Sequence, residues 1–182
     1  MTLSKSNLIL ILIVIISAAA VLLRLLPHLP NFAPIGGLAI FAGMYATKKY
    51  WLLAPLAAMM LSDFFIGFDS WQMTLIIYAS FLVYVLIGIV VKENKSLLSV
   101  VGGTLAGGLV FYLTTNFAVW AFSGMYPHTL QGLILCYEMA LPFFRNTLMG
   151  DLFYVGAFVG AYELAFRLLA SRPRLGPVRL KI

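Results

Sequence analysis

Charged residues are scarce in this chain, and acidic residues are the scarcest. The 182 residues include six Asp and Glu against twelve Lys and Arg, and charged residues make up 10% of the sequence while hydrophobic residues make up 63%. With a mean hydropathy of +1.02, the composition excludes an ordinary soluble domain. The apolar runs are continuous rather than alternating, so we expect an all-α protein whose helices cross a bilayer, not a β-barrel.

Cysteine and the common catalytic motifs are also missing. Cys136 is the single cysteine, which excludes an internal disulfide and a Cys-rich metal site, and we expect neither a metal nor a cofactor. The HExxH, GxSxG and P-loop patterns do not occur in the sequence. We therefore expect that the protein is not an enzyme. An intramembrane enzyme with Asp63 and Asp151 as acid and base, or with Cys136 as nucleophile, is the least favoured alternative.

The net charge of +6 indicates membrane topology rather than nucleic-acid binding. The basic residues form short groups between apolar runs, as in the cytoplasmic loops of membrane proteins. The expected partner is therefore the lipid bilayer, and no nucleic acid is expected.

Six apolar runs are long enough to be considered as membrane spans. They cover residues 8–26, 32–47, 50–67, 72–91, 97–118 and 147–169. If the N-terminus is cytoplasmic and the spans alternate, ten of the twelve basic residues fall on the cytoplasmic side: Lys5, Lys48, Lys49, Lys92, Lys95, Arg167, Arg172, Arg174, Arg179 and Lys181. This asymmetry predicts six transmembrane helices with both termini cytoplasmic, forming one domain over 1–170 with a basic tail over 171–182.

Some runs carry signs of close or irregular packing. The run 32–47 would reach roughly 24 Å as a helix, less than the ~30 Å hydrocarbon core. It is therefore tilted, or it begins as irregular backbone that needs protein or water around it. In the fifth run Gly103 and Gly107 are four residues apart, which predicts close contact with a neighbouring helix, and Gly156 and Gly160 repeat the spacing in the sixth.

Four polar side chains are expected at the same depth, in the outer third of the bundle. Arg24, Asp63, Asn116 and Asp151 each lie near the outer end of a different run. Ionisable residues within spans usually face the protein interior or a water-filled cavity. The pattern predicts a polar site at this level. A purely structural ion pair of Arg24 with Asp63 or Asp151 is the alternative.

The stretch 116–151 is predicted to be the largest outer connection. Apolar residues recur at helical spacing over 129–143, but this segment is short and carries Glu138 in its middle. We therefore expect a short reentrant or interfacial helix that lies over the outer mouth as a lid. Trp120 and Tyr126 could cover a ligand there, or they could belong to the aromatic belt of the membrane interface.

Several segments together resemble a known family. They are Pro30–Gly43, Pro55–Met59, Ser62-Asp63 with Gly67, Thr115–Trp120, Tyr126-Pro127, Gly132-Leu133, Cys136-Tyr137, Pro142–Thr147 and Gly150-Asp151. They resemble a family of small, largely uncharacterised bacterial membrane proteins that is similar to the substrate-binding S components of energy-coupling factor (ECF) transporters. The resemblance implies six helices in the bacterial inner membrane and a pocket near the outer face for a vitamin or a metal ion. It also implies a transmembrane coupling protein and two ATPases as partners.

One departure from the S components bears on the partners. Those that share a coupling protein often carry Ala-x-x-x-Ala in their first helix, whereas here Ala18, Ala19 and Ala20 have no alanine four residues on. A protein that acts without the ATPases therefore stays an alternative. Some cobalamin-specific relatives act alone and use a cysteine near the cobalt. Cys136 is expected on the outer side, but the resemblance does not place it at the corresponding position, so cobalamin is only one candidate ligand.

The predicted function is binding of a small, vitamin-like solute for uptake. The expected ligand-binding residues are Arg24, Asn31, Asp63, Asn116, Trp120, Tyr126, Glu138, Arg145, Asn146 and Asp151. Arg24 or Arg145 would hold an anionic group of the ligand. A structural or assembly protein without a ligand is the alternative from another class.

Overall fold

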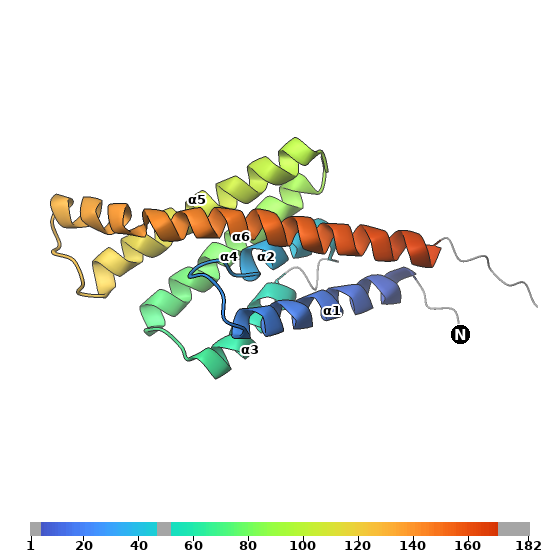
Figure 1. Cartoon of the computed structure of the whole chain (residues 1–182), viewed down its shortest axis with the longest axis horizontal. Helices are drawn as coiled ribbons and strands as arrows, with labels where there is room; N and C mark the ends of the chain where they lie inside the picture. The colour runs from blue at the N-terminus through green and yellow to red at the C-terminus, as the bar shows by residue number, and fades with distance from the viewer. Residues whose placement is uncertain (1–4, 47–51, 171–182) are drawn as a thin grey trace, which may run out of the picture.

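Six helices make up the described part of the chain. The computed structural model describes residues 5–46 and 52–170, which contain helices and short connections and no strand (Figure 1). The helices are α1 (Lys5–Leu25), α2 (Ile35–Tyr45), α3 (Leu53–Ile66), α4 (Trp71–Val91), α5 (Leu97–Phe122) and α6 (Leu130–Ala170). The predicted all-α fold is confirmed. The predicted tail, 171–182, and the basic residues Lys48 and Lys49 lie outside the described residues.

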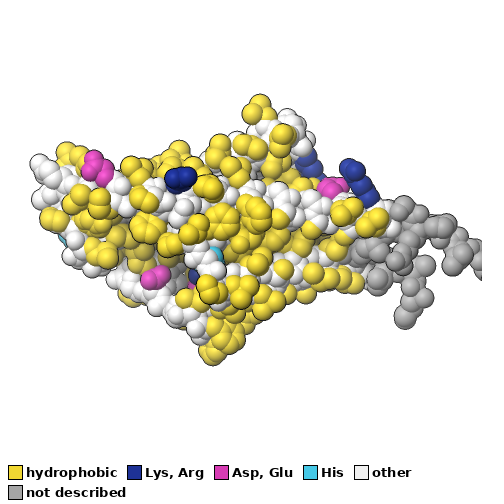
Figure 2. All heavy atoms as spheres, in the orientation of Figure 1, with side chains coloured by type: hydrophobic (Ala, Val, Ile, Leu, Met, Phe, Trp, Pro, Cys, Tyr) yellow, Lys and Arg dark blue, Asp and Glu magenta, His cyan; other side chains and the backbone are white. Residues whose placement is uncertain are grey.

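Three of these helices are long and apolar enough to cross a membrane. They are α4, α5 and α6, the last over Leu130–Leu168. The apolar part of α1, Ile9–Leu25, and the whole of α2 and α3 are shorter. Figure 2 shows that apolar side chains cover most of the visible face of the molecule and that charged groups are few.

Helix α2 lies at the centre of the bundle. All residues from Ile35 to Met44 are buried, and a helix that is apolar on every side is stable only in such an interior position. It packs against α4 and α6, with further contacts to α1, α3 and α5. Residues 32–34 precede it as irregular backbone. Pro34 at the N-cap has no N–H to donate, so the helix begins directly after it.

Glycines bring α2 and α4 into backbone contact. A methyl group added to Gly43 would lie 2.8 Å from the Cα of Gly88 and would collide with the carbonyl oxygen of Val85. The same close approach occurs between α4 and α5, where a methyl on Gly103 would meet the side chain of Val91 at 2.7 Å and one on Gly107 would meet the ring of Tyr84 at 2.8 Å. The predicted packing role of Gly103 and Gly107 is confirmed.

The glycine pair of α6 has a different environment. An added methyl at Gly156 or Gly160 would have nothing within 4 Å, and both residues are exposed. This face of α6 is therefore not packed against another helix of the described chain.

The predicted separate helix over 129–143 is wrong. The segment is the first part of α6, which continues through Pro142 for 41 residues, a length of about 62 Å. The leading part stays in line because it is bonded to α5: the hydroxyl of Tyr137 donates to the carbonyl of Leu113 at 2.8 Å, and the hydroxyl of Tyr112 donates to the carbonyl of Tyr137 at 2.7 Å. As a result, the α5–α6 hairpin extends beyond the other connections at one end of the molecule (Figure 1).

The two ends of the described chain lie together. Figure 1 shows the start of α1 and the end of α6 at the end of the molecule opposite the α5–α6 turn. The α4–α5 turn, which carries Lys92 and Lys95, lies toward the same end as these chain ends.

Candidate functional site

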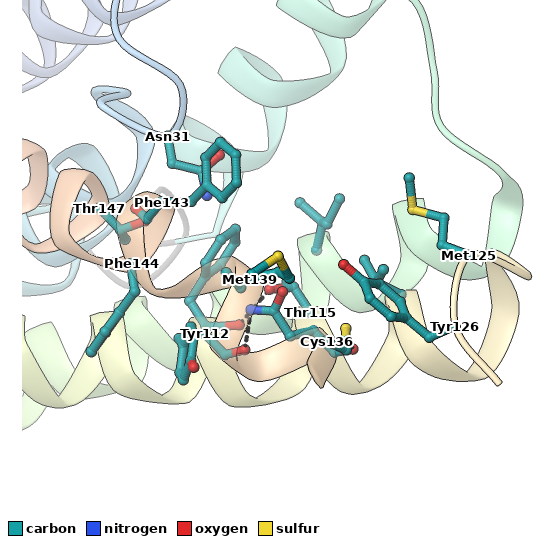
Figure 3. Close-up of a pocket in the computed structure, with 15 residues that line it drawn as sticks. Asn31, Tyr112, Thr115, Met125, Tyr126, Cys136, Met139, Phe143, Phe144 and Thr147 are labelled. Atoms are coloured by element: carbon teal, nitrogen blue, oxygen red, sulfur yellow. Dashed lines mark hydrogen bonds between the residues drawn. The ribbon is translucent and has the colours of Figure 1, made fainter. Parts of the chain in front are cut away.

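A cavity of about 540 Å³ lies between α5 and α6 near the segment that precedes α2 (Figure 3). Its α5 wall is formed by Phe111, Tyr112, Thr115, Asn116 and Val119, and its α6 wall by Cys136, Met139, Ala140, Phe143, Phe144 and Thr147. These positions follow helical spacing, so each wall is one face of one helix. Asn31 and Thr147 lie at one end of the cavity, and Met125 and Tyr126 at the other (Figure 3).

Asn116 supplies a polar group to the middle of this cavity. Its side-chain nitrogen donates to the carbonyl of Tyr112 in the same helix at 2.7 Å. The thiol of Cys136 donates to the backbone carbonyl of Asn116 at 3.3 Å, which ties α6 to α5. Among the described residues, no partner is present for the side-chain oxygen of Asn116, so this oxygen can accept a hydrogen bond from a solute.

A second cavity of about 230 Å³ adjoins the first. Four residues line both cavities: Asn31, Ile77, Phe111 and Thr147. The smaller cavity is also lined by Arg24, Gly36, Asp69, Tyr84 and Asp151. Asn31 is exposed, so it lies at the rim, and its φ of 62° is in the left-handed region that asparagine tolerates better than most residues.

Asp151 is the most buried acidic residue of the site. The residue is 3% exposed, and the hydroxyl of Tyr84 donates to its Oδ2 at 2.5 Å. Gly36 of α2 makes room for the carboxylate, because an added methyl there would collide with Oδ1. The contact therefore joins three helices, α2, α4 and α6, at one point.

Arg24 and Asp63 form an ion pair beside the smaller cavity. The distance from Nη1 of Arg24 to Oδ1 of Asp63 is 2.5 Å, and the hydroxyl of Tyr78 donates to Oδ2 of Asp63 at 2.8 Å. Arg24 also donates to the hydroxyl of Ser62. This cluster connects α1, α3 and α4, and it neutralises the charge that Arg24 would otherwise present to the cavity.

The predicted site residues divide into two groups. Those that line the cavities are Arg24, Asn31, Asn116, Tyr126 and Asp151. Asp63 is connected to the cavity through Arg24. The structure therefore brings together residues from both halves of the chain, from the α1–α2 connection to α6.

The other predicted residues lie off both cavities. Trp120 donates from its indole nitrogen to the carbonyl of Pro127 at 2.9 Å, which fastens the α5–α6 connection. Asn146 donates to the carbonyl of Pro30 at 2.9 Å and ties α6 to the α1–α2 connection. Glu138 and Arg145 are exposed and line neither cavity.

Sequence reasoning missed several aromatic residues of the site. Tyr84, which donates to Asp151, and Tyr112 lie in apolar runs, where aromatic residues usually indicate only packing. Phe144, whose ring stacks on that of Tyr112 at 4.4 Å, lies in the predicted outer connection 116–151. The sequence did contain a sign of one cavity wall: Tyr112, Thr115 and Asn116 have the spacing of residues on one face of a helix.

Metal ligands do not cluster in the described part of the chain. Over residues 5–46 and 52–170, no group of three or more His, Cys, Asp or Glu side chains is placed to hold a metal ion. The candidate site is instead aromatic and thioether-lined with a few polar groups, as in many small-molecule sites.

The fold and the site thus define an all-helical protein with helices able to cross a membrane and a solute-sized cavity between them. The family model described as "Family of unknown function (DUF6580)" matches residues 3–174, so the chain belongs to this family. No curated protein and no solved structure matches the chain.

Proposed function

We propose that this protein is a multi-pass protein of the bacterial inner membrane, with both termini cytoplasmic, that binds a small, vitamin-like solute for uptake. The observation that carries the proposal is the pair of adjoining cavities, about 540 and 230 Å³ in volume. Small-molecule sites in proteins typically occupy about 300–1,000 Å³. The volume available therefore suits a solute of vitamin size.

The chemistry of the lining supports the same proposal. Rings of Tyr112, Phe143 and Phe144 provide flat apolar surface, while Asn116 and Thr147 provide hydrogen-bonding groups at fixed positions on two helices. Sites that orient a ligand combine such apolar walls with a few polar groups.

The expected anion-binding role of the arginines is not part of this proposal. Arg24 is already paired with Asp63, and Arg145 is exposed and lines neither cavity. Polar recognition is assigned instead to Asn31, Asn116 and Asp151.

Operation with a coupling protein and two ATPases, as in ECF transporters, rests on the sequence resemblance alone. The binding proposal requires no such partner. A structural role is the second candidate, and the observation that favours it is the Arg24–Asp63 pair, which ties three helices without needing a ligand.

A cavity-filling substitution tests the proposal. Ala140 lines the larger cavity and is 8% exposed, so Ala140→Phe places a ring in the space of the solute. Ala157 lies on the same helix, is exposed and lines neither cavity, which makes Ala157→Phe the matched control. The protein would be purified in mild detergent from its own cells, and the small molecules released on denaturation would be measured by mass spectrometry.

The wild type and Ala157→Phe are expected to release the same solute in comparable amounts, and Ala140→Phe at least tenfold less. A wild type that releases no solute, or equal release from all three proteins, would contradict the proposal. Thermal unfolding of each variant verifies that Ala140→Phe is folded.

A further inference from the structure

Acidic residues outnumber unpaired basic residues in the described lining of the smaller cavity. Asp69 lies at its rim, Asp151 in its interior, and Arg24 is the basic residue among its described lining. The charge of Arg24 is matched by Asp63 at 2.5 Å. The two aspartates of the lining are thus left without a compensating side-chain cation, and an anionic solute would find no unpaired basic side chain among the described residues that line either cavity.

Asp151 has one oxygen without a partner. Tyr84 donates to Oδ2, but no described residue donates to Oδ1, and the ion pair of the described chain does not include this carboxylate. The residue is 3% exposed and lines the smaller cavity together with Gly36, against which Oδ1 lies, so the carboxylate is approached from this cavity rather than from bulk solvent. A buried carboxylate among apolar helices is costly unless a positive group or a proton accompanies it.

The adjoining larger cavity suits the body of an organic cation. Phe111 lines both cavities, and the rings of Tyr112, Tyr126, Phe143 and Phe144 line the larger one. Aromatic faces attract cations and stack on flat rings. A solute that extends through both cavities would therefore meet a carboxylate at one end and aromatic surface along the rest.

We propose that the solute is an organic cation, an amine or a protonated nitrogen heterocycle, whose positive nitrogen pairs with Oδ1 of Asp151 while its apolar or aromatic body fills the larger cavity. This inference rests on the proposed function and specifies the substrate class of the same site. Gly36 belongs to the recognition, because any larger residue there would displace the carboxylate.

Two probes of similar shape and opposite charge test the inference: phenethylamine and 3-phenylpropionate. Binding of each to the full chain in lipid nanodiscs would be measured by calorimetry at neutral pH, for the wild type, Asp151→Asn and Glu138→Gln. Glu138 is exposed and lines neither cavity, so its amide variant controls for the loss of one negative charge.

The amine is expected to bind the wild type at least tenfold more tightly than the acid. Asp151→Asn should bind the amine at least tenfold more weakly than the wild type does, since a charge-assisted hydrogen bond is lost. Glu138→Gln should bind the amine with the affinity of the wild type. If Asp151→Asn does not fold, the inference is tested by the wild type alone, from the difference in its affinity for the amine and for the acid.

The outcomes separate this inference from the proposed function. If the acid binds as tightly as the amine, the inference that the solute is a cation is wrong, while the proposal that the cavities bind a solute still holds. If neither probe binds, the solute released from the purified wild type decides: a cation supports the inference, and a neutral or anionic solute overturns it. If neither probe binds and no solute is released, the proposed function fails as well.

Discussion

Arg24 and Asp63 are 39 residues apart in sequence, and the ion pair between their side chains joins α1 to α3. Asp63 is 7% exposed and accepts a second hydrogen bond from Tyr78. The pair can be held in this apolar setting because each charge is compensated and hydrogen-bonded, whereas one of them alone would be a buried unpaired charge.

Arg24→Gln is therefore expected to lower the free energy of unfolding by about 3 kcal/mol, since it leaves the carboxylate of Asp63 without its counter-charge. The double variant Arg24→Gln/Asp63→Asn should recover part of this loss, because two neutral amides carry no unpaired charge. Thermal unfolding in detergent measures both effects. A double variant less stable than Arg24→Gln would contradict this account of the pair.

Among single residues, the ionisable ones were the easiest to predict from the sequence. Arg24, Asp63 and Asp151 stand out because charge is expensive inside an apolar run. Their partners Tyr78 and Tyr84 do not stand out, because which hydroxyl meets which carboxylate depends on how each helix is rotated about its axis. Glu138 and Arg145 lie near the cavities in sequence, but they are on exposed faces of α6 and line neither cavity.

At the scale of helices, hydrophobic runs predicted the described helices well, with the exception of α6. Glu138 and the short length of the segment 129–143 suggested a separate helix. The helix instead continues through Pro142, because the proline removes a single hydrogen bond of the helix and the bonds of Tyr112 and Tyr137 between α5 and α6 hold the segment in line. Such tertiary bonds are not visible in a local pattern, so the continuous helix could not be predicted from it.

The crossing of α2 and α4 depends on glycine at the point of contact. Gly88→Ala would place a methyl 3.0 Å from the Cα of Gly43 and against the carbonyl oxygen of Ile40, so we expect a loss of about 1–3 kcal/mol from overpacking against backbone. Gly102→Ala in α5 meets nothing within 4 Å and should be neutral or stabilising by up to about 1 kcal/mol through helix propensity. Chemical unfolding of both variants measures the difference. Equal destabilisation by the two changes would show that the close crossing is not what makes Gly88 necessary.

At the scale of the whole molecule, composition predicted the all-α class, and the positions of polar residues near the outer ends of the runs predicted that Arg24, Asp63, Asn116 and Asp151 would lie at one level. What the sequence could not provide is the space between them. The larger cavity lies between the faces of α5 and α6 that carry Asn116 and Ala140, whereas α2 and α4 touch at Gly43 and Gly88. That difference arises from packing across the whole bundle.

The central claim is that the joined cavities hold a small solute. The most direct test is an experimental structure, at a resolution that defines side chains, of the protein extracted from its own membranes without added ligand. The account predicts a bounded, non-protein density that fills both cavities, within hydrogen-bonding distance of Asn116 and in contact with Asp151. Cavities collapsed onto their own side chains, or filled by lipid chains continuous with the surrounding bilayer, would contradict it.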